Sequence, residues 1–222
     1  GSVDQQVGKY VRIGFTTNTN YSVNRGNQLG MYEVLSKSPI VNPYNEDGTF
    51  KKLIDMPLDT KQTVITRETV EALGDLWINE TMNFASYNNA FAEIKIPGVE
   101  GLSYRVNLGM NYRSSKGGSS TGKGVNNSDP NYPNSASLSH TENTNWVVEN
   151  LLTYDRTFAD KHKVNVVAMY SAEESKYTRS HMSGKDIPAE YFQYYNIGQA
   201  AGEITVNPNN QGYNMSGLIS WM

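Results

Sequence analysis

Residues 104–112 alternate strictly between apolar and polar side chains, and this pattern constrains the fold more than any other feature of the chain. The even positions, from Tyr104 to Tyr112, are apolar or aromatic, and the odd positions between them are polar or glycine. Successive side chains of a β-strand point to opposite faces, so the segment predicts a strand with one apolar and one polar face. Tilted by about 40°, the strand spans roughly 20 Å, close to the apolar band of an outer-membrane barrel.

The same alternation recurs along the chain, in residues 11–23, 88–96, 146–154, 164–173 and a last segment that begins near residue 213. Asn150 interrupts the apolar parity of the fourth segment, so the facing of that strand stays open. No apolar run approaches the ~18–20 residues of a membrane helix. We therefore predict an all-β chain, an antiparallel up-and-down meander of about six long strands.

The predicted connections alternate in length. The turns near residues 97–102 and 158–163 are short, whereas the stretches 25–86, 114–144 and 174–212 are long and rich in Asn, Gly, Ser, Pro and Tyr. Short turns on one rim and long loops on the other are typical of outer-membrane barrels. The pattern predicts an open, partial segment of a transmembrane β-barrel. Within the first long loop it also predicts a turn over residues 45–48 and a short helix over residues 66–74.

Composition and motifs argue against catalysis and cofactors. The net charge of −3 gives no reason to expect nucleic acid as a partner, and the absence of cysteine excludes disulfides and thiolate metal sites. The three histidines lack metal-ligand spacing, and the polar surroundings of Asp129 lack the spacing of a calcium loop. Residues 117–124 resemble a phosphate-binding loop but carry Gly124 where Ser or Thr is required, so we read them as a flexible loop. We expect no catalytic residue, no cofactor and no metal.

The polar sides of the strands are the candidate binding surface. In a closed barrel they would face the lumen, where amides and guanidinium groups suit sugar hydroxyls, peptide amides or a plug domain; a merely hydrated wall is an equally weighted alternative. The candidate lumen-facing residues are Arg12, Asn18, Asn20, Arg105, Asn107, Asn111 and Arg113. Tyr191, Tyr194 and Tyr195 in the last long stretch either stack on glycan rings, bury against a partner protein or pack on each other.

Several phrases, in this order and spacing, resemble the SusC/RagA family of TonB-dependent outer-membrane transporters. In the first long loop, residues 42–48 read Asn-Pro-Tyr-Asn-Glu-Asp-Gly, shortly after Leu-Ser-Lys-Ser-Pro at residues 35–39. Residues 101–109, after Ala-Glu-Ile, resemble a strand of these barrels, and residues 150–158 with 162–166 resemble the next hairpin. The resemblance covers nearly the whole chain.

The resemblance implies a function that spacing alone does not. Such transporters have a barrel of about 22 strands closed by an N-terminal plug. They import oligosaccharides or peptides across the Gram-negative outer membrane, driven through TonB and covered by a SusD-type surface lipoprotein. Residues 1–222 would correspond to a part of the barrel domain, without plug, TonB-contacting segment and remaining strands. No catalytic or ligand residue carries over.

A soluble β-sandwich that binds glycans, such as an adhesin domain, is the alternative. It also explains alternating strands and tyrosine-rich loops. A sandwich buries the apolar faces of its strands against a second sheet, whereas a barrel presents them to lipid. The surroundings of the apolar faces therefore distinguish the two hypotheses.

Overall fold

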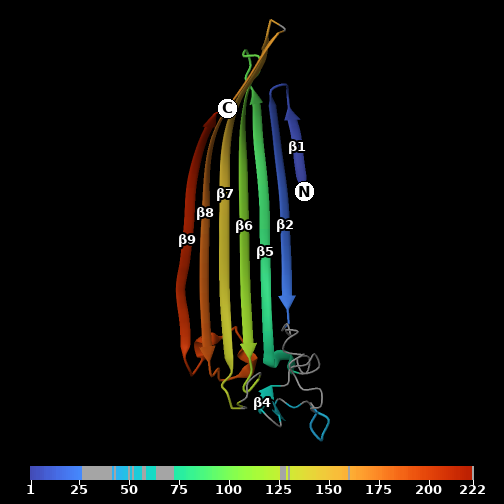
Figure 1. Ribbon diagram of the computed structural model, residues 1–222, viewed down its shortest axis with the longest axis vertical. Coiled ribbons are helices and arrows are strands. Elements are labelled where there is room, and N and C mark those ends of the chain that lie inside the picture. The colour runs from blue at the N-terminus through green and yellow to red at the C-terminus, as the bar shows by residue number, and fades with distance from the viewer. Residues whose placement is uncertain are drawn as a thin grey trace.

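The computed structural model is a tall, single-layered antiparallel sheet (Figure 1). It describes residues 1–26, 42, 44–49, 51, 53–56, 59–63, 73–125, 129, 131–159 and 161–221; for residues 53–56, 59–63 and 207–221 only the backbone is described. Seven strands follow in the order β1-β2-β5-β6-β7-β8-β9, and β3 and β4 form a separate two-stranded sheet. In the described part of the chain, no second sheet packs over the seven-stranded one, so the sandwich alternative is not supported.

The seven strands of the main sheet form an up-and-down meander, in which each strand pairs with the next strand of that sheet along the chain. Their bounds are β1 Ser2–Val7, β2 Val11–Arg25, β3 Leu53–Met56, β4 Asp59–Thr63, β5 Trp77–Lys95, β6 Leu102–Thr121, β7 Ser135–Phe158, β8 His162–Lys185 and β9 Ile204–Trp221. Three short 3₁₀ helices lie in the connections: η1 Gly74–Leu76 directly before β5, and η2 Glu190–Phe192 and η3 Ile197–Gln199 between β8 and β9. The six long strands, β2 and β5–β9, confirm the predicted all-β meander.

The strands are longer than the sequence predicts, and the long loops are correspondingly shorter. The expected loops 25–86, 114–144 and 174–212 shrink to the connections 26–76, 122–134 and 186–203. Alternation of apolar residues marks only the part of a strand that has an apolar face, whereas backbone hydrogen bonds continue through the Ser-, Thr- and Asn-rich extensions beyond it. Residues 117–121, read above as a flexible loop, are for this reason the end of β6.

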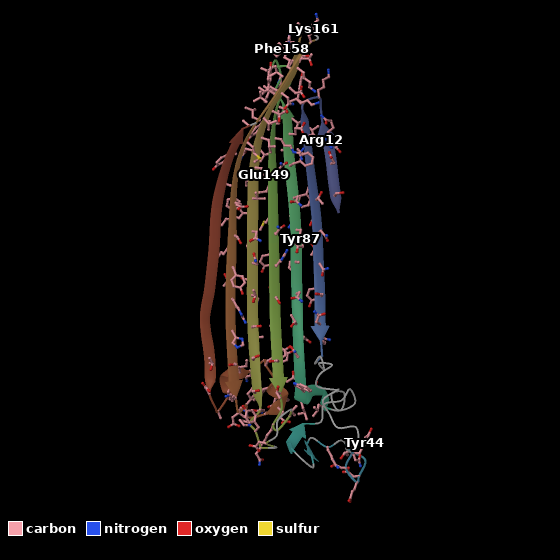
Figure 2. The ribbon with its side chains drawn as sticks, viewed as in Figure 1. Arg12, Tyr44, Tyr87, Glu149, Phe158 and Lys161 are labelled. Carbon is pink, nitrogen blue, oxygen red and sulfur yellow. The ribbon has the colours of Figure 1, made fainter. Side chains whose placement is uncertain are left out.

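The short connections lie together at one end of the sheet, the short-turn rim, at the top of Figure 1. Gly101 adopts a φ of +87°, and a β-carbon there would collide with the backbone carbonyl of Asp155. The close approach lets the amide of Asp155 donate to the carbonyl of Gly101 at 2.9 Å. The β7–β8 hairpin projects farthest at this rim, with Phe158 and Lys161 at its tip (Figure 2).

The longer connections gather at the opposite end, the long-loop rim, and one of them carries the hydrophobic core. Residues 186–203, here called the β8–β9 loop, fold back over one face of the sheet. Its Ile187, Tyr194 and Ile197 are buried against Ala136 of β7. Ile78, Leu138, Phe192 and Ala200 pack around this cluster. The core therefore sits at one rim, and within the described part of the chain both faces of the rest of the sheet are open.

Two predictions fell on the first long loop. The turn over residues 45–48 is confirmed, since the amide of Gly48 donates to the carbonyl of Asn45 at 3.1 Å. The helix predicted over residues 66–74 lies almost entirely outside the described residues.

Candidate functional site

The strand register brings all seven candidate residues to one face of the sheet, here called the polar face. Residues directly opposite each other on neighbouring antiparallel strands project to the same side. Through β5, Arg12 of β2 is thereby aligned with Arg105 of β6, and Asn18 with Asn111. The same register aligns Asn20 with Arg113 and puts Asn107 opposite Phe91.

Near the short-turn rim, the charged groups of the polar face are paired. Arg12 donates from Nε and Nη2 to the two carboxylate oxygens of Asp4, at 2.9 and 2.6 Å. Arg105 lies 3.7 Å from the carboxylate of Glu93 and donates to Oδ1 of Asn107 at 2.8 Å. The amide of Asn107 donates in turn to Glu149 at 3.1 Å. These contacts join β1 to β2 and, separately, β5 to β6 and β7, and together they form the charged network of this rim.

Phe91 is the apolar centre of this network. A β-carbon on Gly14 would collide with the ring of Phe91, which lies directly across the β2–β5 pair. The guanidinium carbons of Arg12 and Arg105 lie 5.6 and 4.3 Å from the ring centroid, within the range of cation–π attraction. The aromatic ring thus fills the space that the glycine leaves and holds both guanidinium groups.

Farther toward the long-loop rim, the polar face consists of amides, hydroxyls and tyrosine rings. Tyr87, labelled in Figure 2, lies between Asn18 and Asn111 in the register, with the Arg113 guanidinium 5.3 Å from its ring centroid. Ser175 of β8 donates to Oδ1 of Asn145 at 2.6 Å in the same row. An array of donors and acceptors next to an aromatic ring suits a hydroxyl- or amide-rich ligand.

The other side of the sheet, here called the apolar face, bears Ile13, Ala92 and Val106, which the register aligns. Its large side chains are exposed to the surroundings, for example Leu108 at 45%. Four aromatic residues bound this face toward the long-loop rim, Tyr21, Phe84, Tyr112 and Trp146. Beyond them, the same face is mostly polar, apart from Val23, Met82 and Met182, or is covered by the β8–β9 loop.

The aromatic boundary crosses the hydrogen-bonded rows at an angle. From β2 to β5 the boundary does not shift, because Tyr21 is opposite Phe84. From β5 to β6 it shifts two residues toward the short-turn rim, because Phe84 is opposite Ser114 and not Tyr112. From β6 to β7 it shifts two more, because Tyr112 is opposite Thr144 and not Trp146. The boundary therefore shifts four residues over three strand-to-strand steps. At ~3.35 Å per residue and ~4.8 Å per strand, this corresponds to a line inclined by about 43° to the rows.

Two of these aromatic residues have partners for their polar atoms. Tyr112 donates to Glu142 at 2.9 Å, and Trp146 donates from Nε1 to Glu174 at 2.9 Å. At the other end of the apolar face, Tyr104 donates to Oδ1 of Asn150 at 2.7 Å. This bond explains why a polar residue interrupts the apolar parity of β7, and the register assigns Trp146, Val148, Asn150 and Leu152 to the apolar face.

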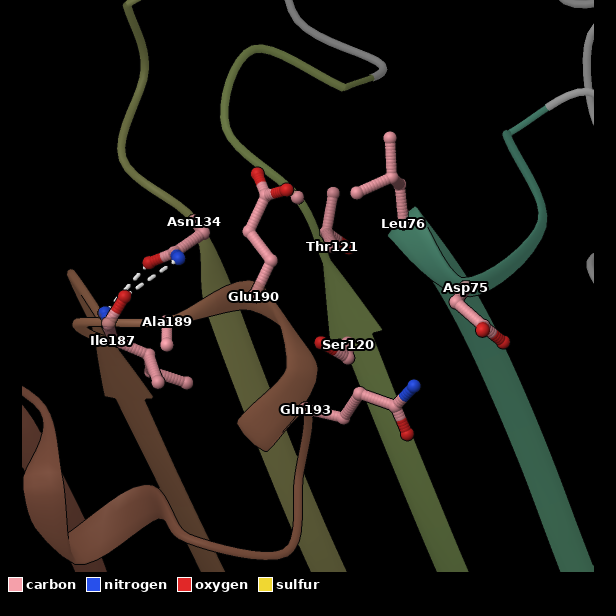
Figure 3. Close-up of a pocket in the computed structure, with 10 residues that line it drawn as sticks. Asp75, Leu76, Ser120, Thr121, Asn134, Ile187, Ala189, Glu190 and Gln193 are labelled. Atoms are coloured by element: carbon pink, nitrogen blue, oxygen red, sulfur yellow. Dashed lines mark hydrogen bonds between the residues drawn. The ribbon is translucent and has the colours of Figure 1, made fainter.

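Two hollows lie at the rims. The cavity in Figure 3 is about 10 Å³, lies between η1, β6 and the β8–β9 loop, and has room for about one water molecule. There the side chain of Asn134 accepts from the amide of Ile187 at 2.6 Å and donates to its carbonyl at 2.8 Å. A hollow of about 620 Å³ at the short-turn rim is open and shallow, lined mainly by residues 95–103.

The sequence prediction missed the polar-face residues of β5, β7 and β8. Tyr87, Phe91, Glu149 and Tyr177 lie among the predicted residues. The turn could have identified those of β5. Once residues 96–101 are taken as the turn of the β5–β6 hairpin, the alternation of β6 determines which residues of β5 project to the polar face. Among the residues described, no group of three or more His, Asp or Glu is arranged to hold a metal. Within the same residues, no helix has the length and apolar character required to cross a membrane.

The loop tyrosines differ in their surroundings. Tyr194 is buried, with 4% exposure, while Tyr191 and Tyr195 are 76% and 70% exposed. Tyr194 and Tyr195 pack on each other with ring centroids 4.3 Å apart, and Tyr191 packs on Phe192 at 4.4 Å. Of the three expectations, mutual packing is thus observed.

Comparisons with known proteins agree with the fold. No protein-family model matches the chain. TonB-dependent receptor P39 of Formosa agariphila is 24% identical over 196 residues, which are 87% of this chain and 18% of that receptor. The chain therefore spans about a fifth of that relative's length.

Solved structures of transporters share the arrangement of strands. The RagAB peptide transporter matches with a TM-score of 0.69 and 13% identity, over 98% of this chain and 24% of that chain. The RagAB peptide importer in the 'open-open' state matches with a TM-score of 0.63 and 14% identity, over the same shares. The matched proteins are named as a receptor, a transporter and an importer, and none is named as an enzyme. The chain is thus similar in sequence to a TonB-dependent receptor and in fold to part of the RagAB transporter, which confirms the resemblance to the TonB-dependent outer-membrane transporters.

Proposed function

We propose that the chain is part of the wall of a TonB-dependent transporter that imports nutrients across the Gram-negative outer membrane. The observation that carries the proposal is the inclined aromatic boundary of the apolar face. Strands of outer-membrane barrels tilt by about 35–45°, and aromatic girdles mark the two membrane interfaces. A boundary inclined by about 43° to the rows of paired residues lies parallel to the membrane plane when the strands tilt by the same angle from the membrane normal. A protein core gives no reason for an aromatic boundary inclined in this way.

In this arrangement the polar face lines the lumen, and the long-loop rim faces outward. Arg12, Asn18, Asn20, Arg105, Asn107, Asn111 and Arg113 would then face a plug domain, water or the transported substrate. The paired charges around Phe91 lie nearest the short turns and would meet the plug or the periplasmic half of the lumen. The amide-rich middle of the face would be reached by a substrate that enters from outside.

The transported class follows from the resemblance, and we propose oligosaccharides or peptides. The RagAB structures are named for peptide transport, which supports the peptide alternative. Amides, hydroxyls and tyrosine rings on the polar face suit either class. A SusD-type surface lipoprotein and TonB are the proposed partners, the latter acting through a part of the receptor outside this chain.

Single-cysteine spin labelling of the receptor in proteoliposomes tests the facing, because this chain contains no cysteine. In a cysteine-free background, labels on Leu108→Cys and on the neighbouring Asn107→Cys form a matched pair on one strand. We expect the Leu108 label to be accessible to oxygen dissolved in lipid and the Asn107 label to water-soluble paramagnetic reagents. A Leu108 label shielded from both reagents would contradict the proposal, since it would indicate a protein core.

A further inference from the structure

Charges on the polar face are segregated along the strands. Between the short-turn rim and the row of Tyr87, this face carries both signs, and every carboxylate that β1, β2, β5, β6, β7 and β8 contribute to it lies there: Asp4, Glu93, Glu149, Asp155 and Glu173. At the long-loop rim, Glu203, which precedes β9, is paired with Lys185 at 3.8 Å. From the row of Tyr87 to the long-loop rim, the described side chains that β2, β5, β6, β7 and β8 contribute to this face include no carboxylate. In β9, residues 204–221 contain no charged residue.

Two arginines stand in this carboxylate-free region, Arg113 of β6 and Arg179 of β8. Both side chains are exposed. Arg113 contacts the ring of Tyr87, and among the described residues neither guanidinium forms an ion pair. Arg12 and Arg105, on the same face, lie beside Asp4 and Glu93. The arginines of this face that lack an ion pair are therefore confined to the half that is nearer the long loops.

The register fixes how the two arginines are spaced. Arg113 is opposite Asn143, which is opposite Tyr177, and Arg179 follows two residues later on β8. Two strand spacings and two residues along a strand separate their α-carbons by roughly 12 Å. This distance is too long for both guanidinium groups to bind one carboxylate closely, but it suits two acidic groups of an extended oligomer.

Two polar atoms beside these arginines have no partner in the structure. Oδ1 of Asn143 and Nδ1 of His181 are buried and form no hydrogen bond. Asn143 lies between Arg113 and Tyr177 in the register, and His181 follows Arg179 by two residues. Unsatisfied buried polar atoms cost about 1–3 kcal/mol and are uncommon in native proteins. The wall beside the two arginines is therefore incompletely hydrogen-bonded in this structure.

We propose that Arg113 and Arg179 form an anion-binding ledge that takes an oligomer bearing carboxylates, with Tyr87 and Tyr177 as stacking surfaces. Guanidinium groups bind carboxylates through paired, charge-assisted hydrogen bonds. A positive region of a water-filled lumen also attracts anions from outside. The inference rests on the proposed function, in which the polar face lines the lumen. Uronate oligosaccharides and acidic peptides share the required chemistry.

Binding to the full-length, detergent-solubilised receptor tests the ledge by calorimetry at low salt. The acidic probes are a galacturonate tetramer and a glutamate tetrapeptide, and the neutral probes are a maltose-type tetramer and a glycine tetrapeptide. We expect one acidic probe to bind at least ten-fold more tightly than its neutral counterpart, and the better acidic probe identifies the source of the carboxylates. Arg113→Gln and Arg179→Gln should each weaken that binding about ten-fold.

Lys116→Gln is the matched control, because Lys116 is an exposed cation on the same strand that projects to the opposite face. It should leave the affinity unchanged. Equal binding of acidic and neutral probes, no binding of either acidic probe at ~1 mM, or equal losses in all three variants overturns the ledge. The spin-label result separates the two proposals: a water-accessible Asn107 label together with failed anion binding rejects the ledge alone, and a lipid-accessible Asn107 label rejects both.

Discussion

The ring of Tyr194 lies directly over Gly118, so that a β-carbon on Gly118 would be only 2.6 Å from ring carbons of the tyrosine. Gly118 belongs to β6 and Tyr194 to the β8–β9 loop. The Tyr194 hydroxyl donates to Glu80 of β5 at 3.4 Å, and Glu80 is paired with Arg25 of β2. One tyrosine therefore connects the loop to three strands, and a glycine makes room for it.

Gly118→Ala should undock the β8–β9 loop. The added methyl group collides with an aromatic ring that is held by neighbours on several sides, and overpacking of this kind costs about 1–3 kcal/mol. Hydrogen exchange of the loop amides in the full-length receptor measures the effect, and we expect faster exchange over residues 187–200. Gly198→Ala is the control, because a β-carbon there meets nothing within 4 Å. Unchanged exchange in Gly118→Ala would mean that Tyr194 is free to move aside.

High pH should undock the same loop. Burial, with the neighbouring Tyr195 hydroxyl and the Glu80 carboxylate, raises the pKa of Tyr194 above its ordinary value. The free loop therefore loses the proton first, so docking is unaffected below pH about 10 and weakens as the pH rises further. The measurement is the hydrogen-exchange rate of the loop amides as a function of pH, corrected for the intrinsic pH dependence of exchange. The control is Tyr194→Phe, which should remove the alkaline transition. A transition that persists in Tyr194→Phe would assign it to another group.

Asn134→Ala should loosen the start of the β8–β9 loop. The side chain of Asn134 satisfies both backbone groups of the buried Ile187 (Figure 3), and its removal leaves them without protein partners. We expect a loss of about 1–3 kcal/mol in loop docking, again measured by hydrogen exchange. Asn131→Ala, in the same connection but with an exposed side chain, should have no effect. Equal effects of both variants would show that the connection responds to any change of sequence.

Phe91→Ala should loosen the β2–β5 pair near the short-turn rim. It uncovers Gly14 and removes two cation–π contacts, each worth about 0.5–1 kcal/mol at exposed sites. Faster exchange of the β2 amides around Gly14 is the expected result. Phe91→Leu should recover the share of the exchange protection that comes from covering Gly14, but not the share that comes from the arginine contacts. If leucine restores the full protection, the cation–π contacts contribute nothing.

The sequence by itself determined the two faces of the sheet. Because side chains alternate with a period of two, the parity of residues 104–112 assigned each residue of that segment to a face, and short turns carried the assignment to its neighbours. The register aligns all seven candidate residues on one face, and that this face meets the lumen stays a prediction. The same reasoning left β7 open, because the partner that makes Asn150 compatible with the apolar face, Tyr104, is 46 residues away.

Only the tertiary structure decided the strand ends, the docked loop and the pattern of charge pairing. Strands such as β6 continue past their apolar part because the backbone ladder does not depend on side-chain polarity. Tyr194 and Tyr195 are neighbours of the same residue type, and contacts with Gly118 of β6 and the cluster around Ala136 of β7 distinguish the buried ring from the exposed one. Likewise, Arg105 and Arg113 look equivalent along β6, and the neighbouring strands alone give a carboxylate to the first and none to the second. The alternation of side chains along a strand is a property of the local sequence, whereas contacts between residues of distant strands depend on the register with which those strands pair.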